Sequence, residues 1–334
     1  MIISRTPFRV SLFGGGTDYP KWYLKHGGAV FGFAINKYCY ISIRALPPFF
    51  EHRHRIVYSK VENVKDLREI QHPAVRGVLT DQGTDVGLEI HHDGDLPARA
   101  GLGSSSSFTV GLLNALSALK GLMIDKKRLA GEAIRIEQDV IKEHVGSQDQ
   151  VWAAFGGLNR INFFKNGDFD VVPAIIAPAR REELLGKLQL YFTGFSRFAS
   201  EIAKKQIANV DRREKHLTAI MGMVDEALKV LQSNGRPIRE IGELLHESWR
   251  LKRELADDVT TPEIDDIYQS ARDAGAVGGK LLGAGGGGFM ILFVEPEKQR
   301  AVAERLRKLV RVNVGVDDVG SKIVVYEPAG LENR

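Results

Sequence analysis

The sequence contains a single cysteine, Cys39, and no uninterrupted apolar run of eighteen residues. One thiol cannot build the internal disulfide framework that many small secreted domains require. A helix needs an apolar run of about that length to cross a bilayer, so we expect no membrane contact. The first ten residues carry two arginines and no long apolar stretch, and we therefore expect no signal peptide. These absences predict a cytoplasmic protein.

The sequence has no strong excess of positive or negative charge. The 334 residues include 46 Lys and Arg and 42 Asp and Glu, which leaves a formal net charge of +4. Basic residues alternate with acids throughout, and no block of five or six like charges occurs. A nucleic-acid-binding protein concentrates its cations on one stripe, so we expect no nucleic-acid partner. The mild basic excess is equally compatible with anionic small-molecule ligands.

The chain is long for one hydrophobic core. At 334 residues, two domains are the natural expectation. Pro173 and Pro178 interrupt the apolar pattern, and we place the boundary there, which gives domains at 1–178 and 179–334. β-branched and aromatic residues predict strands, which lie at 30–45, 55–58, 86–91, 188–193 and 289–294.

Apolar residues at helical spacing predict the remaining elements. Before the boundary, one helix follows a run of four serines, one covers 126–143 with Val140 on its apolar face, and a short one begins near Asp149. After the boundary, two long charged helices precede a helix that starts at Pro262 and a last one at 296–309. This order of elements indicates an α+β fold.

The segment 96–107 joins two glycines to four serines at the start of a predicted helix. Gly101 and Gly103 let the backbone approach a ligand, and the helix start offers unpaired N–H groups and a positive dipole end. Together they suit a phosphate group, and a serine hydroxyl there can ligate magnesium. The alternative is a tight turn with a redundant serine cap, although four serines exceed what a cap requires. The segment is not a Walker A loop, because it does not end in Gly-Lys-Ser/Thr. It is not a Rossmann fingerprint either, because Ser106 stands where the third glycine is required.

Two further segments are rich in glycine. Segment 278–288 leads into an apolar strand and not into a helix, which excludes a dinucleotide fingerprint. So many glycines carry a large entropic cost for a mere hairpin connection, so we favour close packing against a ligand. Segment 7–19 carries Arg9 on an alternating strand and leads through three glycines to Asp18. Asp18 can equally be the cap of the next helix.

Two acids follow in the same half of the chain. Glu137 lies in the helix predicted at 126–143, and Asp149 lies twelve residues later, beyond a break at Gly146. Lone acids on helices are usually solvated. At a helix N-terminus the dipole favours the ionised form, so Asp149 suits either a cap or a carboxylate that accepts a hydrogen bond from a substrate hydroxyl.

These segments together resemble the GHMP kinases, the superfamily of galactokinase, homoserine kinase, mevalonate kinase and phosphomevalonate kinase. Three motifs occur in the family order and span essentially the whole chain: Pro7-x-Arg9 to Gly-Gly-Gly-Thr17-Asp18-Tyr19, Pro97-x-x-Ala100-Gly-Leu-Gly-Ser-Ser-Ser106, and Lys280-Leu-Leu-Gly-Ala-Gly-Gly-Gly-Gly288. The first motif, and Tyr191-Phe-Thr-Gly194 with Arg197 and Ser200, look most like the D-glycero-D-manno-heptose 7-phosphate kinases. Galactokinases carry Gly-Glu-His-Thr-Asp where this chain has three glycines before Thr-Asp, which weighs against galactose.

The resemblance implies a two-domain fold, with an N-terminal mixed-sheet ATP-binding domain, a C-terminal ferredoxin-like α+β domain and the active site in the cleft between them. It implies transfer of the γ-phosphoryl group of ATP, with Mg²⁺, to a sugar phosphate. The expected acceptor is the anomeric hydroxyl of D-glycero-D-manno-heptose 7-phosphate, and the alternative is a galactose-, fucose- or uronate-type sugar. The expected partners are ATP and the sugar phosphate, and a homodimer is compatible with the sequence.

The resemblance also implies roles for individual residues. Asp149 matches the catalytic aspartate, and Arg9 the basic residue that stabilises charge near the transferred phosphoryl group. Glu137 and Ser105 match the magnesium ligands. The loop that wraps the nucleotide phosphates comprises Ala100, Gly101, Leu102, Gly103, Ser104, Ser105, Ser106 and Ser107. Substrate contacts are expected at Gly15, Gly16, Asp18, Gly146, Thr193, Arg197, Lys280, Gly285 and Gly286. A distal sugar phosphate is expected at Arg197 first and at Lys280 second.

Three other functions compete with a kinase. A decarboxylase of the same fold would also bind ATP, but the sugar-holding Thr17-Asp18-Tyr19 speaks against it. A non-catalytic sugar sensor has no need of Asp149, Glu137 and Arg9, all of which are present. A nucleic-acid-binding protein is disfavoured by the scattered charge. An assay of ATP hydrolysis with a panel of sugar phosphates separates all three.

Overall fold

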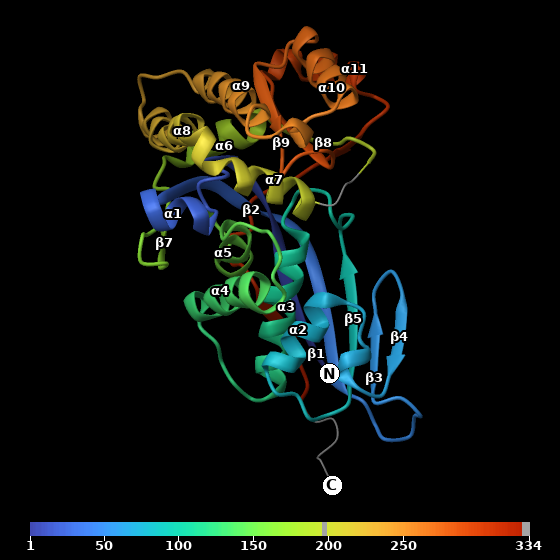
Figure 1. Cartoon of the computed structure of the whole chain (residues 1–334). Coiled ribbons are helices and arrows are strands. Elements are labelled where there is room, and N and C mark those ends of the chain that lie inside the picture. Colours follow the sequence, from blue (N-terminus) through green and yellow to red (C-terminus); the bar gives the residue numbers. More distant parts are fainter. Residues whose placement is uncertain (196–198, 329–334) are drawn as a thin grey trace.

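The computed structural model of the chain describes residues 1–195 and 199–328. Within these ranges the backbone forms two β-sheets, each with helices packed against it, at opposite ends of an elongated molecule (Figure 1). The blue-to-green part of the chain builds the larger end, and the yellow-to-orange part builds the smaller end. The predicted α+β fold with two sheets is confirmed.

The larger sheet has eight strands in the spatial order β12-β1-β2-β5-β3-β4, with β6 paired to β2 and β7 paired to β6. Its strands are β1 (Ile2–Phe13), β2 (Gly28–Ala45), β3 (His54–Val57), β4 (Val61–Val64), β5 (Leu88–Gly94), β6 (Leu158–Phe163), β7 (Phe169–Pro173) and β12 (Lys322–Tyr326). Strands β3 and β5 run parallel and every other pair is antiparallel, so the sheet is mixed. With 18 residues, β2 is long enough to pair with β6 near its start and with β5 near its end.

Helices cover this sheet. They are α1 (Pro20–His26), α2 (Pro73–Asp81), α3 (Ser104–Leu119), α4 (Lys126–Arg135) and α5 (Gln148–Phe155), with a 3₁₀ turn at Leu67–Glu69. Helix α3 contacts β1 and β2 on one side and α2, α4 and α5 on the others. It is therefore apolar almost all round, with most residues from Ser106 to Leu116 buried. This enclosure fixes the serine-rich start of α3 against both the sheet and the outer helices.

The helix predicted at 126–143 ends early. Its α-helical part stops at Arg135, and a π-helical turn covers Ile136–Val140. The wider turn buries Ile136 and Glu137, whereas Val140, predicted on the apolar face, is 38% exposed. A π-turn inserts one residue into the helical repeat, which shifts every later side chain around the axis. The prediction for Val140 was wrong for that reason.

The smaller sheet has four antiparallel strands in the order β11-β8-β10-β9. They are β8 (Leu188–Phe192), β9 (Gly278–Leu281), β10 (Phe289–Phe293) and β11 (Val310–Val312). The helices are α6 (Pro178–Lys187), α7 (Ala199–Asn209), α8 (Glu214–Gln232), α9 (Arg239–Arg253), α10 (Pro262–Asp273) and α11 (Gln299–Arg305), with 3₁₀ turns at Val210–Arg213, Asp257–Val259 and Pro296–Lys298. Helices α7 to α10 lie between β8 and β9, and α11 lies between β10 and β11. With the four helices α7 to α10 in the place of one, this is the β-α-β-β-α-β ferredoxin-like pattern that was predicted. No helix among the described residues is long and apolar enough to span a bilayer.

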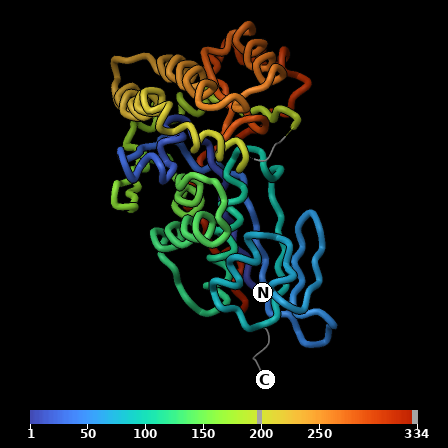
Figure 2. The backbone as a smooth tube through the Cα atoms, viewed as in Figure 1, coloured from blue at the N-terminus to red at the C-terminus, as the bar shows by residue number. Residues whose placement is uncertain are grey.

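The chain returns to the larger sheet at its end. Strand β12 pairs with β1 in antiparallel register, and Ile35 bridges to Val316. Figure 2 shows this as red tube beside the blue of the first strand. The boundary at 178/179 stays a prediction, and residues 316–326, which it assigns to the second domain, pair with the first sheet.

Candidate active site

The serine-rich loop is built on left-handed glycines. Gly101 has φ +82° and Gly103, the N-cap of α3, has φ +75°, a region that side chains rarely adopt. A Cβ on Gly101 would lie 2.7 Å from the carbonyl oxygen of Leu282. The loop is also pinned by side chains, because the Ser107 hydroxyl donates to the Pro7 carbonyl at 2.8 Å. The N–H groups that open α3 are therefore held in one arrangement.

The third glycine segment packs directly on this loop. The Phe289 N–H donates to the Ala100 carbonyl at 3.0 Å, and a Cβ on Gly288 would lie 2.2 Å from the same oxygen. A Cβ on Gly283 would lie 2.6 Å from the Gly101 Cα. At these positions the glycines admit neighbouring backbone, which accounts for them without a ligand, and the predicted packing against a ligand stays a prediction.

Gly285 and Gly286 were predicted to contact the substrate, which stays a prediction, and both contact backbone within the protein. A Cβ on Gly285 would lie 2.6 Å from the carbonyl oxygen of Val259, and the Gly286 N–H donates to that oxygen at 3.0 Å. Thr193 is buried, donates its hydroxyl to the Gly288 carbonyl at 2.8 Å and accepts from the Gly288 N–H at 3.1 Å. Its donor is thus used within the protein. Arg197 lies outside the described residues.

Arg9 and Asp149 form a bidentate ion pair. The Arg9 Nε donates to Asp149 Oδ1 at 2.7 Å and Nη2 to Oδ2 at 2.6 Å, while Nη1 donates to the Gly101 carbonyl at 2.6 Å. The Arg9 side chain is 5% exposed and that of Asp149 is 23% exposed. Arg9 therefore orients Asp149 at the start of α5 and ties it to the serine-rich loop. Every guanidinium nitrogen is engaged in this arrangement.

Asp18 lies beside that pair and is buried. Its Oδ1 accepts from the Gly16 N–H at 2.9 Å and its Oδ2 from the Gln148 N–H at 3.4 Å. Burial, and next the charge of Asp149, raise the pKa of Asp18, and the backbone donors oppose that rise. A Cβ on Gly146 would lie 1.9 Å from Asp18 Oδ2, so glycine is required there by the carboxylate.

The remaining glycines of the first motif differ in their surroundings. A Cβ on Gly16 would meet the Leu217 side chain at 3.0 Å, so the position faces α8. A Cβ on Gly15 would have only ordinary contacts, with Ser11 Oγ at 3.7 Å and Gln148 Nε2 at 3.8 Å. The Ser11 hydroxyl donates to Gln148 Oε1 at 2.8 Å. Of the two glycines, Gly15 therefore has more room for a ligand.

Glu137 is buried in the π-turn beside the serine-rich loop. Its Oε2 accepts from the Ser106 hydroxyl at 2.9 Å and from Gln150 Nε2 at 2.5 Å, whereas Oε1 is buried without a hydrogen-bond partner in the described part of the chain. Burial raises the pKa of Glu137 to about 7. The sequence paired Glu137 with Ser105; in the structure Ser106 contacts it and Ser105 is exposed.

These residues fit Mg²⁺. One unpartnered carboxylate oxygen, with serine hydroxyls close by in the loop, is an all-oxygen donor set. Mg²⁺ is commonly bound by one or two carboxylates together with waters and substrate phosphates. No cluster of three or more His, Cys, Asp or Glu side chains with metal-binding geometry occurs among the described residues, so a metal here would need ligands from the substrate.

Two buried lysines complete the site. Lys280 on β9 was predicted, and its Nζ donates to the Leu12 carbonyl at 3.0 Å. Lys252 on α9 was missed; its Nζ donates to the carbonyls of Leu281 at 2.9 Å and Gly283 at 2.5 Å. A signal for Lys252 exists in the sequence, because it continues the buried helical face of Leu245 and Trp249. A lysine on an apolar face is rarely fully buried without a specific reason.

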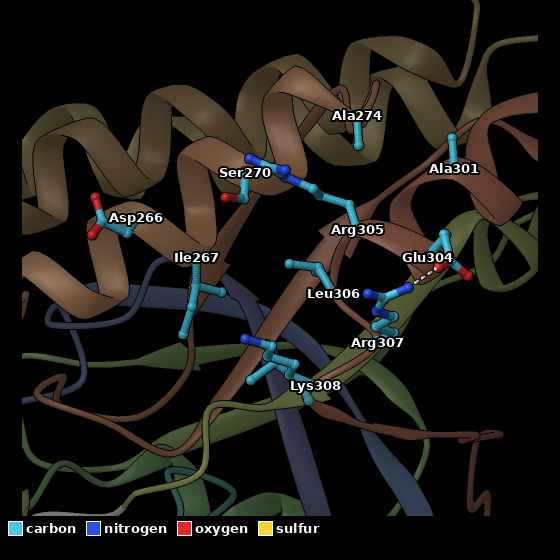
Figure 3. A pocket seen from close by; sticks show the side chains of 11 residues that line it. Asp266, Ile267, Ser270, Ala274, Ala301, Glu304, Arg305, Leu306, Arg307 and Lys308 are labelled. Atoms are coloured by element: carbon cyan, nitrogen blue, oxygen red, sulfur yellow. Dashed lines mark hydrogen bonds and ion pairs between the residues drawn. The ribbon is translucent and has the colours of Figure 1, made fainter.

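A cavity of about 740 Å³ lies elsewhere, between α10 and the end of α11. Figure 3 shows its lining, with the Arg305 and Ser270 side chains on one side and Lys308 on the other. It shares no lining residue with the cluster around Asp149. We place the site at the cluster and not at this cavity, because the cluster brings the paired acid and base, the helix N-terminus and the buried lysines together.

Comparisons with known proteins agree with this geometry. The model of the GHMP kinases N terminal domain matches residues 68–157, and that of GHMP kinases C terminal matches residues 226–312. A D-glycero-alpha-D-manno-heptose 7-phosphate kinase from Campylobacter jejuni is 30% identical over 92% of this chain and 93% of its own length. A bifunctional fucokinase/GDP-fucose pyrophosphorylase from Arabidopsis thaliana is 26% identical over 93% of this chain and 31% of its own length. The crystal structure of a D-glycero-D-manno-heptose 1-phosphate kinase from Bacteroides thetaiotaomicron is 24% identical, with a TM-score of 0.78 over 98% of this chain and 100% of that one.

Proposed function

Because the chain belongs to the GHMP kinase family, and is therefore a phosphotransferase with an alcohol group as acceptor, we propose that it phosphorylates the anomeric hydroxyl of D-glycero-D-manno-heptose 7-phosphate. The product is the 1,7-bisphosphate, and ATP is the phosphoryl donor. The full-length similarity to a heptose 7-phosphate kinase supports this acceptor. The single observation that carries the reaction is the Arg9–Asp149 ion pair at the phosphate loop.

In this proposal the protein positions the reactants and neutralises charge, which is most of what phosphoryl transfer requires. The N–H groups at the start of α3 hold the phosphates of ATP. Asp149, held by two bonds from Arg9, accepts a hydrogen bond from the acceptor hydroxyl and takes its proton as the new ester bond forms. Asp18, fixed by backbone donors on both oxygens, contacts other sugar hydroxyls.

Magnesium would be held by Glu137 Oε1 and by serine hydroxyls of the loop, together with the ATP phosphates. Its contribution when bound is charge neutralisation on the β- and γ-phosphate oxygens. The protein's part is to present an ionised carboxylate. Because Glu137 is buried and its pKa is raised to about 7, a nearby cation would stabilise the charged form.

A distal sugar phosphate needs a receptor away from the reacting hydroxyl. Lys280 stays the second candidate for that role, although it is buried and its Nζ donates to the Leu12 carbonyl. Arg197 stays the first candidate, since guanidinium binds phosphate in a bidentate way. We expect Arg197→Ala to raise the KM for the heptose phosphate about tenfold or more, because a charged hydrogen bond contributes about 1.5–3 kcal/mol.

The test is a coupled assay of ADP release with a panel of acceptors: heptose 7-phosphate, the same heptose without phosphate, fucose, galactose and a uronic acid. The expected result is the highest kcat/KM for heptose 7-phosphate, with Arg197→Ala changing the KM for ATP little. Equal kinetics with and without the 7-phosphate would reject both the acceptor and the receptor.

The second candidate is a kinase that acts on an unphosphorylated sugar. The similarity to the fucokinase-containing protein, over 93% of this chain, favours fucose within that class. The same panel decides, because highest activity on fucose would replace the heptose proposal while leaving Asp149 and the phosphate loop in their roles.

A further inference from the structure

Two ammonium groups are buried together without a carboxylate partner. Lys252 and Lys280 are 7% and 4% exposed, and the Nζ atoms of both donate only to backbone carbonyls among the described residues. Transferring an ammonium group out of water is costly unless an opposite charge compensates it. Two buried lysines without a carboxylate partner are therefore unusual, and they contrast with the nearby Arg9, whose charge is paired with Asp149.

The position of Lys252 is specific. It reaches from α9 to the carbonyls on both sides of Leu282, the residue whose own carbonyl packs on Gly101. The Gly283 Cα region in turn packs on the Gly101 backbone. One side chain thus holds the third glycine segment against the loop that binds phosphate. A Trp249 ring 5.9 Å from the Lys252 Nζ lies on the other side.

The charges that face Lys252 come from three elements. They are Lys280 on β9, Arg9 on β1 and Asp18 after β1. Arg9 has its charge balanced by Asp149, so one buried carboxylate, Asp18, stands against two lysines. Burial first, then Lys280 and then Arg9, lower the pKa of Lys252 well below its usual range, and burial followed by Arg9 lowers that of Lys280 to about 7.

We propose that Lys252 is a positioning residue for the phosphoryl transfer, and that with Lys280 it forms a buried cationic pair that becomes fully charged only when a phosphate-bearing substrate occupies the loop it holds. This proposal rests on the proposed function. The bound phosphates supply the negative charge that the pair lacks in the free protein. Binding then draws a proton from solvent onto the pair, and the third glycine segment stays fixed over the phosphate loop by two ammonium hydrogen bonds.

The test is calorimetric titration with ATP and excess Mg²⁺ at pH 8, in two buffers of different ionisation enthalpy. ATP is fully ionised at that pH, so a difference between proteins in protons bound belongs to the protein. We expect net uptake for the wild type. Lys252→Met should reduce it by about half, and so should Lys280→Met, because each variant lacks one of the two buried amines that take up a proton. The exposed Lys165→Met is the matched control.

Kinetics and stability complete the design. We expect Lys252→Met to lower kcat about 10- to 100-fold, since a small displacement of the loop misaligns the reactants. Unchanged proton uptake in both variants would overturn the proposal even if kcat fell, because a purely structural lysine also lowers kcat.

Failure of the wild type to bind ATP would instead reject the proposed function, and the pair is then tested without ligand. The pKa of a buried lysine is lowered only in the folded protein, so above about pH 7 the unfolded chain binds more protons than the folded protein does. The free energy of unfolding of the wild type should therefore rise from about pH 7 toward pH 10. In Lys252→Met the free energy of unfolding should rise less over the same pH range. An equal rise in both proteins would overturn the proposal of a buried cationic pair.

Discussion

Replacement of Asp149 by asparagine tests the centre of the proposed mechanism. The change keeps the shape of the side chain and removes its charge and its capacity to take a proton. A positioned acid–base group contributes about 10²- to 10⁴-fold, so we expect kcat to fall at least a hundredfold. Nucleotide binding should survive, because the phosphate loop is held by Ser107, Phe289 and the backbone of Gly283, which the substitution does not touch.

The structure also sets the effect on stability. Arg9 is almost fully buried and gives two of its three hydrogen-bonding nitrogens to Asp149. With asparagine, one of these bonds is replaced by two facing N–H groups, and a bond between charged groups contributes about 1.5–3 kcal/mol. Asp18 offsets part of this loss, because removal of the Asp149 charge lowers its raised pKa. We expect a net loss of about 1–2 kcal/mol in the free energy of unfolding.

The assay is ADP release for kcat, calorimetric titration for ATP binding and urea denaturation for stability. The exposed Asp139 on the π-turn provides the control, and Asp139→Asn should change none of the three. Near wild-type kcat in Asp149→Asn would refute its assignment as the acceptor's base. Loss of ATP binding together with kcat would show that Asp149 supports the loop and not the chemistry.

Three further substitutions extend these tests. Glu137→Gln should raise the Mg²⁺ concentration for half-maximal rate about tenfold, and an unchanged titration would remove Glu137 from the metal site. Gly146→Ala should lower stability by about 1–3 kcal/mol and kcat with it, because the added Cβ overlaps Asp18, whereas Gly131→Ala, with open space around it, should not; equal effects would contradict this packing. Burial lowers the pKa of His72 to about 4, so between pH 6.5 and about 4 the unfolded chain takes up the proton before the folded protein does, and acidification through that range should destabilise the wild type. His72→Asn, which can still cap α2, should reduce this dependence of the free energy of unfolding on pH, measured by denaturation at a series of pH values. An unchanged slope would exclude His72 as its cause.

The parts of this molecule that local chemistry determines could be predicted from the sequence. A helix beyond Gly103, the start of α10 at Pro262 and the strand after the third glycine segment follow from residue types at fixed offsets, although α3 already begins at Ser104, within the serine run that was expected to precede it. A hydroxyl directly before Pro262 specifies a helix start without reference to the rest of the fold. These predictions are confirmed.

The parts that depend on tertiary packing could not. Nothing local signals the π-turn, since it exists to bury Glu137 against Ser106 and Gln150, residues from two other segments. For the same reason the glycines at 283 and 288 were explained by a ligand, when their neighbour is the backbone of a segment almost two hundred residues earlier in the chain. Lys252 had a signal in its helical position, but its partners are carbonyls that no sequence pattern marks.

One physical consequence connects these findings. The two glycine segments approach so closely that their contacts are backbone to backbone, and no side chain separates them. Backbone contacts are insensitive to rotamer choice, so the hydrogen bond from the Phe289 N–H to the Ala100 carbonyl fixes the separation of the two segments. Asp149 is tied to the same loop through Arg9 and Gly101. The proposed base, the phosphate-binding N–H groups and the third glycine segment thus share one rigid reference, and in-line transfer requires reacting atoms held at such fixed separations. A substitution that adds a Cβ at Gly101 or Gly288 should therefore damage catalysis from a position that need not contact either substrate.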